Sequence, residues 1–132
     1  MIAFKYRFHG HGSLRYVYSH GGAVRSRLVT LKHSRHPKRK NPRVAVVVSK
    51  KVYKGAVGRN RIRRRIYEIV RHELPYFHDN QDVVLIVFSS EILTMPASEV
   101  EAAIKQLLNT AGVYKKQTKN GIMGQITNTE VE

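Results

Sequence analysis

The clearest pattern of apolar and polar positions lies within Ser49–Arg71, where isoleucine and valine recur with helical spacing. Ile62, Ile66, Ile69 and Val70 stand at i, i+4, i+7 and i+8, which places them on one stripe of an α-helix. The opposite face holds Asn60, Arg61, Arg64, Glu68 and Arg71. The pattern predicts an amphipathic helix that follows a turn at Lys54-Gly55 and stops near Leu74-Pro75.

The rest of the chain predicts two more helices and three strands. In order they are a short helix Leu14–His20 capped by Ser13 and ended by Gly21-Gly22, strands Arg27–Lys32, Arg43–Ser49 and Asp82–Phe88, and a final helix that opens on the capping box Ser98–Glu101 and ends before Gly112. The apolar run of Arg43–Ser49 is typical of a central strand. The order α-β-β-α-β-α predicts a single α+β domain, an α/β sandwich with a small central sheet and three helices.

We expect this domain to cover residues 1–117. Residues 1–12 are basic and rich in glycine and histidine without periodicity, which predicts a flexible or loosely docked arm. Residues 118–132 are polar and aperiodic, which predicts a disordered tail.

Positive charge is concentrated in the first half of the chain. The 132 residues carry a net charge of +15, but residues 1–67 hold 19 lysines and arginines and no acid, whereas residues 68–132 hold the other 5 and all 9 acids. The halves therefore carry +19 and −4. This asymmetry favours a polyanionic partner. RNA or DNA fits better than a membrane surface, which would favour an exposed apolar face with aromatic anchors.

The sequence offers little catalytic chemistry of its own. It has no cysteine, and its closely spaced histidine pairs, His9/His11 and His33/His36, lie in cationic surroundings that oppose a divalent ion. Asp79 and Asp82 are the only aspartates, too few for a two-metal nuclease site. With no phosphate-loop or nucleophile motif, no membrane-length apolar run and no signal peptide, we expect a cytoplasmic protein without a metal site or small-molecule substrate of its own.

The candidate RNA-binding residues surround the start of the arginine-rich helix. They are Lys50, Lys51, Lys54, Arg59, Asn60, Arg61, Arg63, Arg64 and Arg65. Lysines beside a helix N-terminus favour phosphate binding, and arginine binds phosphate through two parallel hydrogen bonds. Within the helix these like charges repel, with only Glu68 to relieve them, so the row indicates an external polyanion. Asn60 fits two roles equally, as a partner for a base or sugar and as a helix cap.

Three short motifs in this region are distinctive. They are Ser49-Lys50-Lys51-Val52, Ala56-Val57 and Arg59-Asn60-Arg61-Ile62-Arg63-Arg64. Together they resemble the signature of the protein subunit of bacterial ribonuclease P, and the similarity extends over about residues 6–116. The chain departs from the family at Leu14 and Leu31, where aromatic residues are usual. Its loop Tyr53-Lys54-Gly55 is one residue longer than usual.

The resemblance implies a left-handed β-α-β crossover, although general rules favour a right-handed one. It implies that catalysis resides in an RNA partner, which uses Mg²⁺ to remove the 5′ leader of precursor tRNA, and that the protein binds that RNA. Position by position, Arg59, Asn60, Arg61, Arg64 and Arg65 would face the RNA. The single-stranded leader would lie in a cleft lined by Leu14, Tyr18, Val29, Leu31 and Val47. The main alternative is a ribosomal or ribosome-assembly RNA-binding protein, which would share the charge and size.

Overall fold

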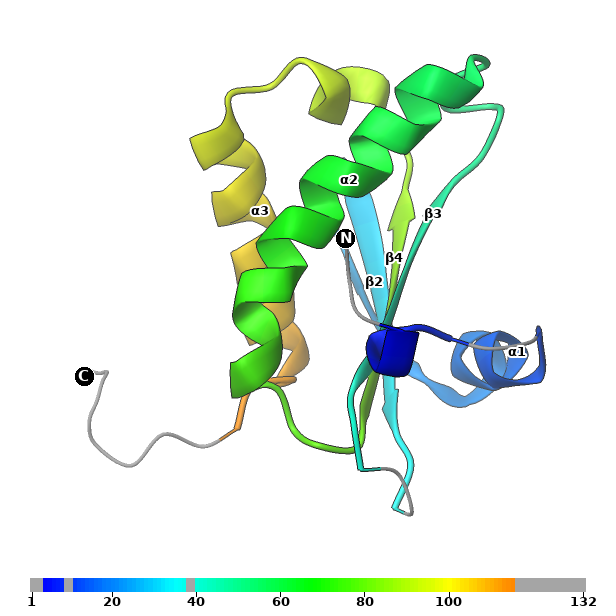
Figure 1. Cartoon of the computed structure of the whole chain (residues 1–132), viewed down its shortest axis with the longest axis vertical. Coiled ribbons are helices and arrows are strands. Elements are labelled where there is room, and N and C mark those ends of the chain that lie inside the picture. The colour runs from blue at the N-terminus through cyan, green and yellow to red at the C-terminus, as the bar shows by residue number, and fades with distance from the viewer. Residues whose placement is uncertain (1–3, 9–10, 38–39, 116–132) are drawn as a thin grey trace.

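A four-stranded mixed sheet separates the helices into two layers (Figure 1). The computed structural model describes residues 4–8, 11–37 and 40–115. The elements are η1 (Phe4–Tyr6), α1 (His11–His20), β1 (Gly22–Arg25), β2 (Val29–Arg35), β3 (Arg43–Val48), α2 (Ala56–Glu73), η2 (Leu74–Tyr76), β4 (Gln81–Val87), η3 (Ser90–Leu93) and α3 (Ala97–Ala111). Helices α2 and α3 cover one face of the sheet and α1 lies on the other. The predicted α+β class is confirmed.

The strand order in the sheet is β1-β2-β4-β3. Strand β3 runs parallel to β4, while β1 and β2, and β2 and β4, pair antiparallel. Helix α2 makes the crossover between β3 and its parallel neighbour β4. The left-handedness of this crossover stays a prediction.

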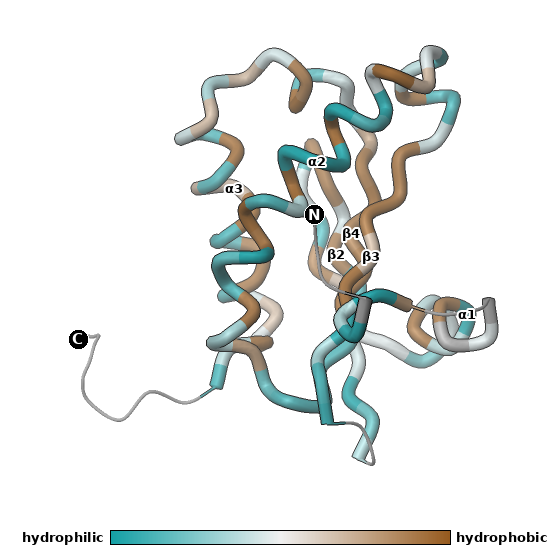
Figure 2. The backbone as a smooth tube through the Cα atoms, viewed as in Figure 1, coloured by the Kyte–Doolittle hydropathy of each residue, from teal (hydrophilic) through white to brown (hydrophobic). Residues whose placement is uncertain are grey.

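Helix α2 forms where the apolar spacing predicts it. Ile62, Ile66 and Val70 are fully buried against the sheet, and Ile69 is half-buried toward α3. Burying each such side chain stabilises the fold by about 1.5–3 kcal/mol relative to exposure. In Figure 2 the apolar residues lie along the strands and on parts of the two long helices, while hydrophilic residues mark the remaining turns of α2. Leu74 and Pro75 open the short helix η2, which ends α2 as expected.

Four details of the sequence-based assignment are wrong. Strand β1 was not predicted. Strand β3 is an edge strand, and β2 and β4 are the central ones. Helix α1 begins at His11, so Ser13 lies within it rather than capping it. Helix α3 begins at Ala97 after Pro96 with no side-chain cap, so Ser98 does not form the expected capping box. Its predicted end is confirmed, because Gly112 takes the left-handed conformation, φ 72°, that ends many helices.

Part of the N-terminal arm is docked on the sheet. Phe4–Tyr6 form a turn of 3-10 helix, and Arg7 pairs with Val44 at the outer edge of β3. His11 and Gly12 belong to α1 rather than to the predicted arm, and the expectation that the arm is flexible or loosely docked stays a prediction. The predicted tail, residues 118–132, lies outside the described residues.

Candidate RNA interface

The outer face of α2 carries the exposed polar side chains that the helical spacing predicts. Asn60, Arg61, Arg64, Glu68 and Arg71 are all exposed, opposite the buried stripe of Ile62, Ile66 and Val70. The helix has no acidic residue in its first turn and no side-chain cap at Gly55. The first backbone N–H groups of α2 and the positive end of its dipole therefore add to the positive potential at the N-terminus of the helix.

Arg65 does not belong to this outer face. It is half-buried, and its guanidinium donates hydrogen bonds to the backbone carbonyl oxygens of Ile92 and, at 2.7 Å, Met95. These bonds fix the segment between β4 and α3 against α2. Two of the donors of Arg65 are thus directed to the protein rather than to the outer face of α2, and contact between Arg65 and RNA stays a prediction.

Two other arginines also donate within the protein. Arg59 donates from Nη1 to the backbone oxygen of Tyr53 at 3.0 Å and to that of Lys54, so it holds the loop between β3 and α2. Arg63 donates to Oδ1 of Asn60. The cap role considered for Asn60 is excluded, because the helix begins after Gly55 and Asn60 lies in its second turn.

Arg71 is neutralised by an acid on the same helix. Its Nη2 lies 2.5 Å from Oε2 of Glu68, and this hydrogen bond is the main cause that lowers the pKa of the Glu68 carboxyl below its ordinary value. The Glu68 carboxylate in turn raises the pKa of Arg71. This pair leaves the C-terminal part of α2 with less available positive charge than its N-terminal part.

Five cations remain, which we call the cationic face: Lys50, Lys51, Lys54, Arg61 and Arg64. All are exposed, and none of their side chains makes a hydrogen bond or ion pair with another described residue. They lie in the loop that leads into α2 and on its N-terminal half. Exposed cations without internal partners are suited to binding phosphates.

The sheet face that α1 partly covers is the second candidate surface. Strand pairing places Thr30, Ile86 and Val47 side by side on this face. Val47 and Ile86 are half-buried, and Phe88, just after β4, is 59% exposed. Helix α1 adds Leu14, which is half-buried, and Tyr18, which is 38% exposed; Lys32 Nζ donates to the Tyr18 carbonyl at 3.2 Å. We call Leu14, Tyr18, Val47, Ile86 and Phe88 the open apolar face.

Two residues predicted for the leader cleft lie on the wrong side of the sheet. Val29 pairs through Val87 with Val48, and Leu31 pairs through Leu85 with Val46. All six belong to the core under α2 and α3, where Val29 is 2% exposed and Leu31 is 0% exposed. Successive strand residues point to opposite faces, so Val29 and Leu31 cannot share a cleft with Val47. Ile86, which the sequence analysis did not name, lies on the same side as Val47, and the exposed Phe88 follows it two positions along the chain.

A buried ion pair below α1 was also missed. Arg43 and Asp82 are paired across β3 and β4, and their side chains are 8% and 4% exposed. Nε and Nη2 of Arg43 lie 3.0 and 2.9 Å from the two carboxylate oxygens, and the Arg43 guanidinium lies 4.5 Å from the ring centre of Phe8. This pair joins the end of the sheet to the docked arm, so Asp82 has a structural role.

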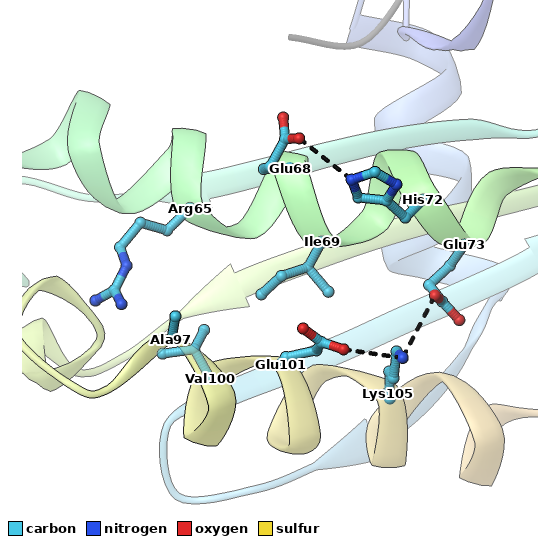
Figure 3. A pocket seen from close by; sticks show the side chains of 9 residues that line it. All are labelled: Arg65, Glu68, Ile69, His72, Glu73, Ala97, Val100, Glu101 and Lys105. Carbon is cyan, nitrogen blue, oxygen red and sulfur yellow. Dashed lines mark ion pairs between the residues drawn. The ribbon is translucent and has the colours of Figure 1, made fainter.

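Acidic side chains gather in a groove between α2 and α3 (Figure 3). Glu68, Glu73 and Glu101 line it, and Lys105 bridges the last two at 3.8 and 3.0 Å. Three of the nine acids of the chain therefore line this groove, two from α2 and one from α3.

Neither a metal cluster nor a membrane segment occurs in the part of the chain that the structure describes. No group of three or more His, Asp or Glu side chains is placed there to hold an ion. None of the helices described is both long enough and apolar enough to cross a bilayer.

Fold and site together define a small, strongly basic α+β protein with its available cations around one helix and an open apolar sheet face. The family model for ribonuclease P matches residues 3–112. The ribonuclease P protein component of Cyanothece sp. is 35% identical over 83 residues, which cover 63% of each chain, and that of Roseiflexus castenholzii is 37% identical over 78 residues, covering 59% of this chain and 63% of the relative. The chain belongs to the ribonuclease P protein family, and it aligns with less than two thirds of the length of these relatives.

A solved structure supports the fold. The Staphylococcus aureus RNase P protein superposes with a TM-score of 0.74 at 23% sequence identity, over 83% of this chain and 98% of the other. The family match does not favour the ribosomal alternative.

Proposed function

We propose that this chain is the protein component of a ribonuclease P, and that it binds the RNA subunit through its cationic face. The observation that carries the proposal is the division of the α2 arginines. Arg61 and Arg64 are exposed and make no side-chain hydrogen bond or ion pair with another described residue, while Arg59, Arg63 and Arg65 donate within the protein. The lysines of the preceding loop extend the same charge toward the N-terminus of α2.

The open apolar face is proposed as the contact for the single-stranded 5′ leader of precursor tRNA. Unpaired bases have exposed ring faces that stack on aromatic and apolar side chains. Tyr18 and Phe88 offer such contacts, and Lys32 places a charge beside Tyr18, with Nζ 5.6 Å from the ring centre. A leader held here would help to align precursor tRNA with the catalytic RNA.

Catalysis is assigned to the RNA subunit. The side chains of the cationic face are lysines and arginines, which do not bind cations. The described residues also offer no carboxylate cluster that could hold a metal ion. We therefore assign Mg²⁺ mainly to phosphates of the RNA, where it would activate the attacking water. The protein's part is to bind, to orient and to lower the repulsion between two polyanions.

The test is cleavage of a 5′-extended precursor tRNA at low Mg²⁺, with protein alone, RNA subunit alone and both together. We expect cleavage only with both. Cleavage by the protein alone would reveal a catalytic site that these residues do not explain. If the protein does not stimulate cleavage by the RNA subunit, the proposal is contradicted and the ribosomal alternative is favoured instead.

The leader position has its own test. Replacing Phe88 with a photo-crosslinking phenylalanine analogue should crosslink to leader nucleotides, while the same replacement at Tyr76, which lies beyond the C-terminal end of α2, should not. Equal crosslinking at both positions would contradict the leader assignment.

A further inference from the structure

Tyr53 is held on the surface of the loop between β3 and α2 in an unusual way. Its ring packs against Gly58, one turn into the helix, so closely that a Cβ on Gly58 would lie 2.1 Å from Cε2 of the ring. A Cβ on Gly55 would lie 3.4 Å from the same atom. The two glycines, three positions apart, form a flat seat for the ring. Even so, Tyr53 remains 37% exposed.

The backbone under this ring is fixed from two sides. The N–H groups of Val52 and Tyr53 donate to the carbonyl of Ser49 at 3.1 and 3.4 Å, which closes a turn. Arg59 donates to the carbonyls of Tyr53 and Lys54 from the helix side. A ring that is already positioned loses little conformational freedom when it binds a ligand, which favours affinity.

The surroundings of the ring favour a nucleotide as its ligand. Lys50, Lys51 and Lys54 lie in the same loop, and all three are exposed and unpaired within the part of the chain that the structure describes. Val57, which lies between the two glycines in the sequence, is exposed as well. An exposed tyrosine among cations, in a part of the chain that has no acids, suits a base together with its phosphate better than it suits a protein surface.

Filling space is the simplest role for a tyrosine beside two glycines. That role does not account for the part of Tyr53 that stays exposed. The exposed aromatic surface needs a further reason, and a stacked base supplies one.

We propose that Tyr53 is a stacking platform for one unpaired nucleotide of the RNA that binds along α2. The contact is with the ring face of a base, so it tolerates any of the four bases. This inference rests on the proposed RNA binding and adds a specific contact to it. Arg59 acts as a positioning residue for the platform through the loop carbonyls.

The chain has no tryptophan, which gives a direct test. In the full-length Tyr53→Trp variant the new indole is the only one, and its emission should be quenched when the ribonuclease P RNA transcript is added, because stacking on a base quenches indole fluorescence. The matched control is Tyr76→Trp. Tyr76 is 53% exposed but lies beyond the other end of α2, so its emission should not change. Binding of both variants is measured in parallel by filter retention.

Affinity gives the second readout. Stacking of one base is worth about 1–3 kcal/mol, so Tyr53→Leu should bind the transcript roughly 5- to 150-fold more weakly. Tyr53→Phe keeps the ring and should bind like the unchanged protein. Gly58→Ala should displace the ring from its seat and weaken binding as Tyr53→Leu does, while urea unfolding of each free variant reports any loss of stability separately.

The outcomes separate the inference from the proposed function. If the transcript binds Tyr53→Trp without quenching, or binds Tyr53→Leu as tightly as Tyr53→Phe, the platform is refuted and the proposed function stands. If the unchanged protein does not bind the transcript, the proposed function fails and the inference fails with it.

Discussion

Replacing Arg61 and Arg64 with alanine tests whether the exposed arginines of α2 bind phosphate. A hydrogen bond to a charged group contributes about 1.5–3 kcal/mol. Both side chains are exposed in the free protein, where water and salt screen them, so the lower end of this range applies. Each single substitution should therefore weaken RNA binding about tenfold at low salt.

The salt dependence is the sharper measurement. Each phosphate contact contributes about 0.7–0.9 to the slope of log affinity against log salt, so a fourfold rise in salt costs about threefold in affinity per contact. Each single variant should lose one such contribution, and the double variant two. Affinity would be measured by filter binding or fluorescence anisotropy at four salt concentrations.

Two control variants make the result specific. Arg27→Ala removes an exposed arginine whose Nη1 lies 2.5 Å from Oε2 of Glu91, outside the cationic face, and should leave the slope unchanged. Arg61→Lys keeps the charge and should retain the slope with a smaller loss of affinity, because lysine cannot form the bidentate contact. If the slope of Arg61→Ala and of Arg64→Ala equals that of the unchanged protein, these residues do not contact phosphate.

Three further predictions concern the groups that support the site. Arg65→Met should lower the free energy of unfolding, measured in urea, by about 1–3 kcal/mol, because two backbone carbonyls lose their donor. The salt slope of RNA binding should stay unchanged, and a reduced slope would show that Arg65 contacts the RNA. Asp82→Asn should cost about 3–5 kcal/mol by the same assay, because Arg43 would be left buried without its counter-charge; a loss below 1 kcal/mol would contradict this. Burial, and then the charge of Arg35, lowers the pKa of His33 in the folded protein, so protonation favours the unfolded chain. The free energy of unfolding should therefore fall as the pH drops through and below 6.5, and it should fall less in His33→Gln. An equal fall in both proteins would show that His33 does not contribute to this pH dependence.

The parts of the fold that sequence predicted best are those with a long, regular period. Helix α2 repeats its apolar stripe over several turns, and both of its ends carry strong signals in Gly55 and Pro75. Strand β1 has no comparable signal. It is four residues long and mostly exposed, and it exists because its backbone pairs with β2. Such a strand depends on a neighbour that a local pattern does not reveal.

The face of each strand was harder to predict than the strand itself. Leu28, Val29, Thr30 and Leu31 are all buried, so β2 shows no alternation that would separate the covered side from the open one. The pairing of β2 with β4, and of β4 with β3, settles which residues share a side. Neighbouring positions of a strand face opposite sides, so a carry-over from the family pattern that is one position off in β2 places Val29 and Leu31 on the wrong face.

The arginines of α2 show why composition overstates an RNA-binding surface. Of the six between residues 59 and 71, Arg59, Arg63, Arg65 and Arg71 already donate to groups of the protein, the most distant of them 30 positions along the chain. No local pattern distinguishes them from Arg61 and Arg64. If all six bound phosphate, they would contribute about 4–5 to the salt slope, whereas two contribute about 1.4–1.8. The difference in slope between the unchanged protein and the double alanine variant therefore measures the contribution of Arg61 and Arg64, and the slope that remains measures the contacts made by the other cations.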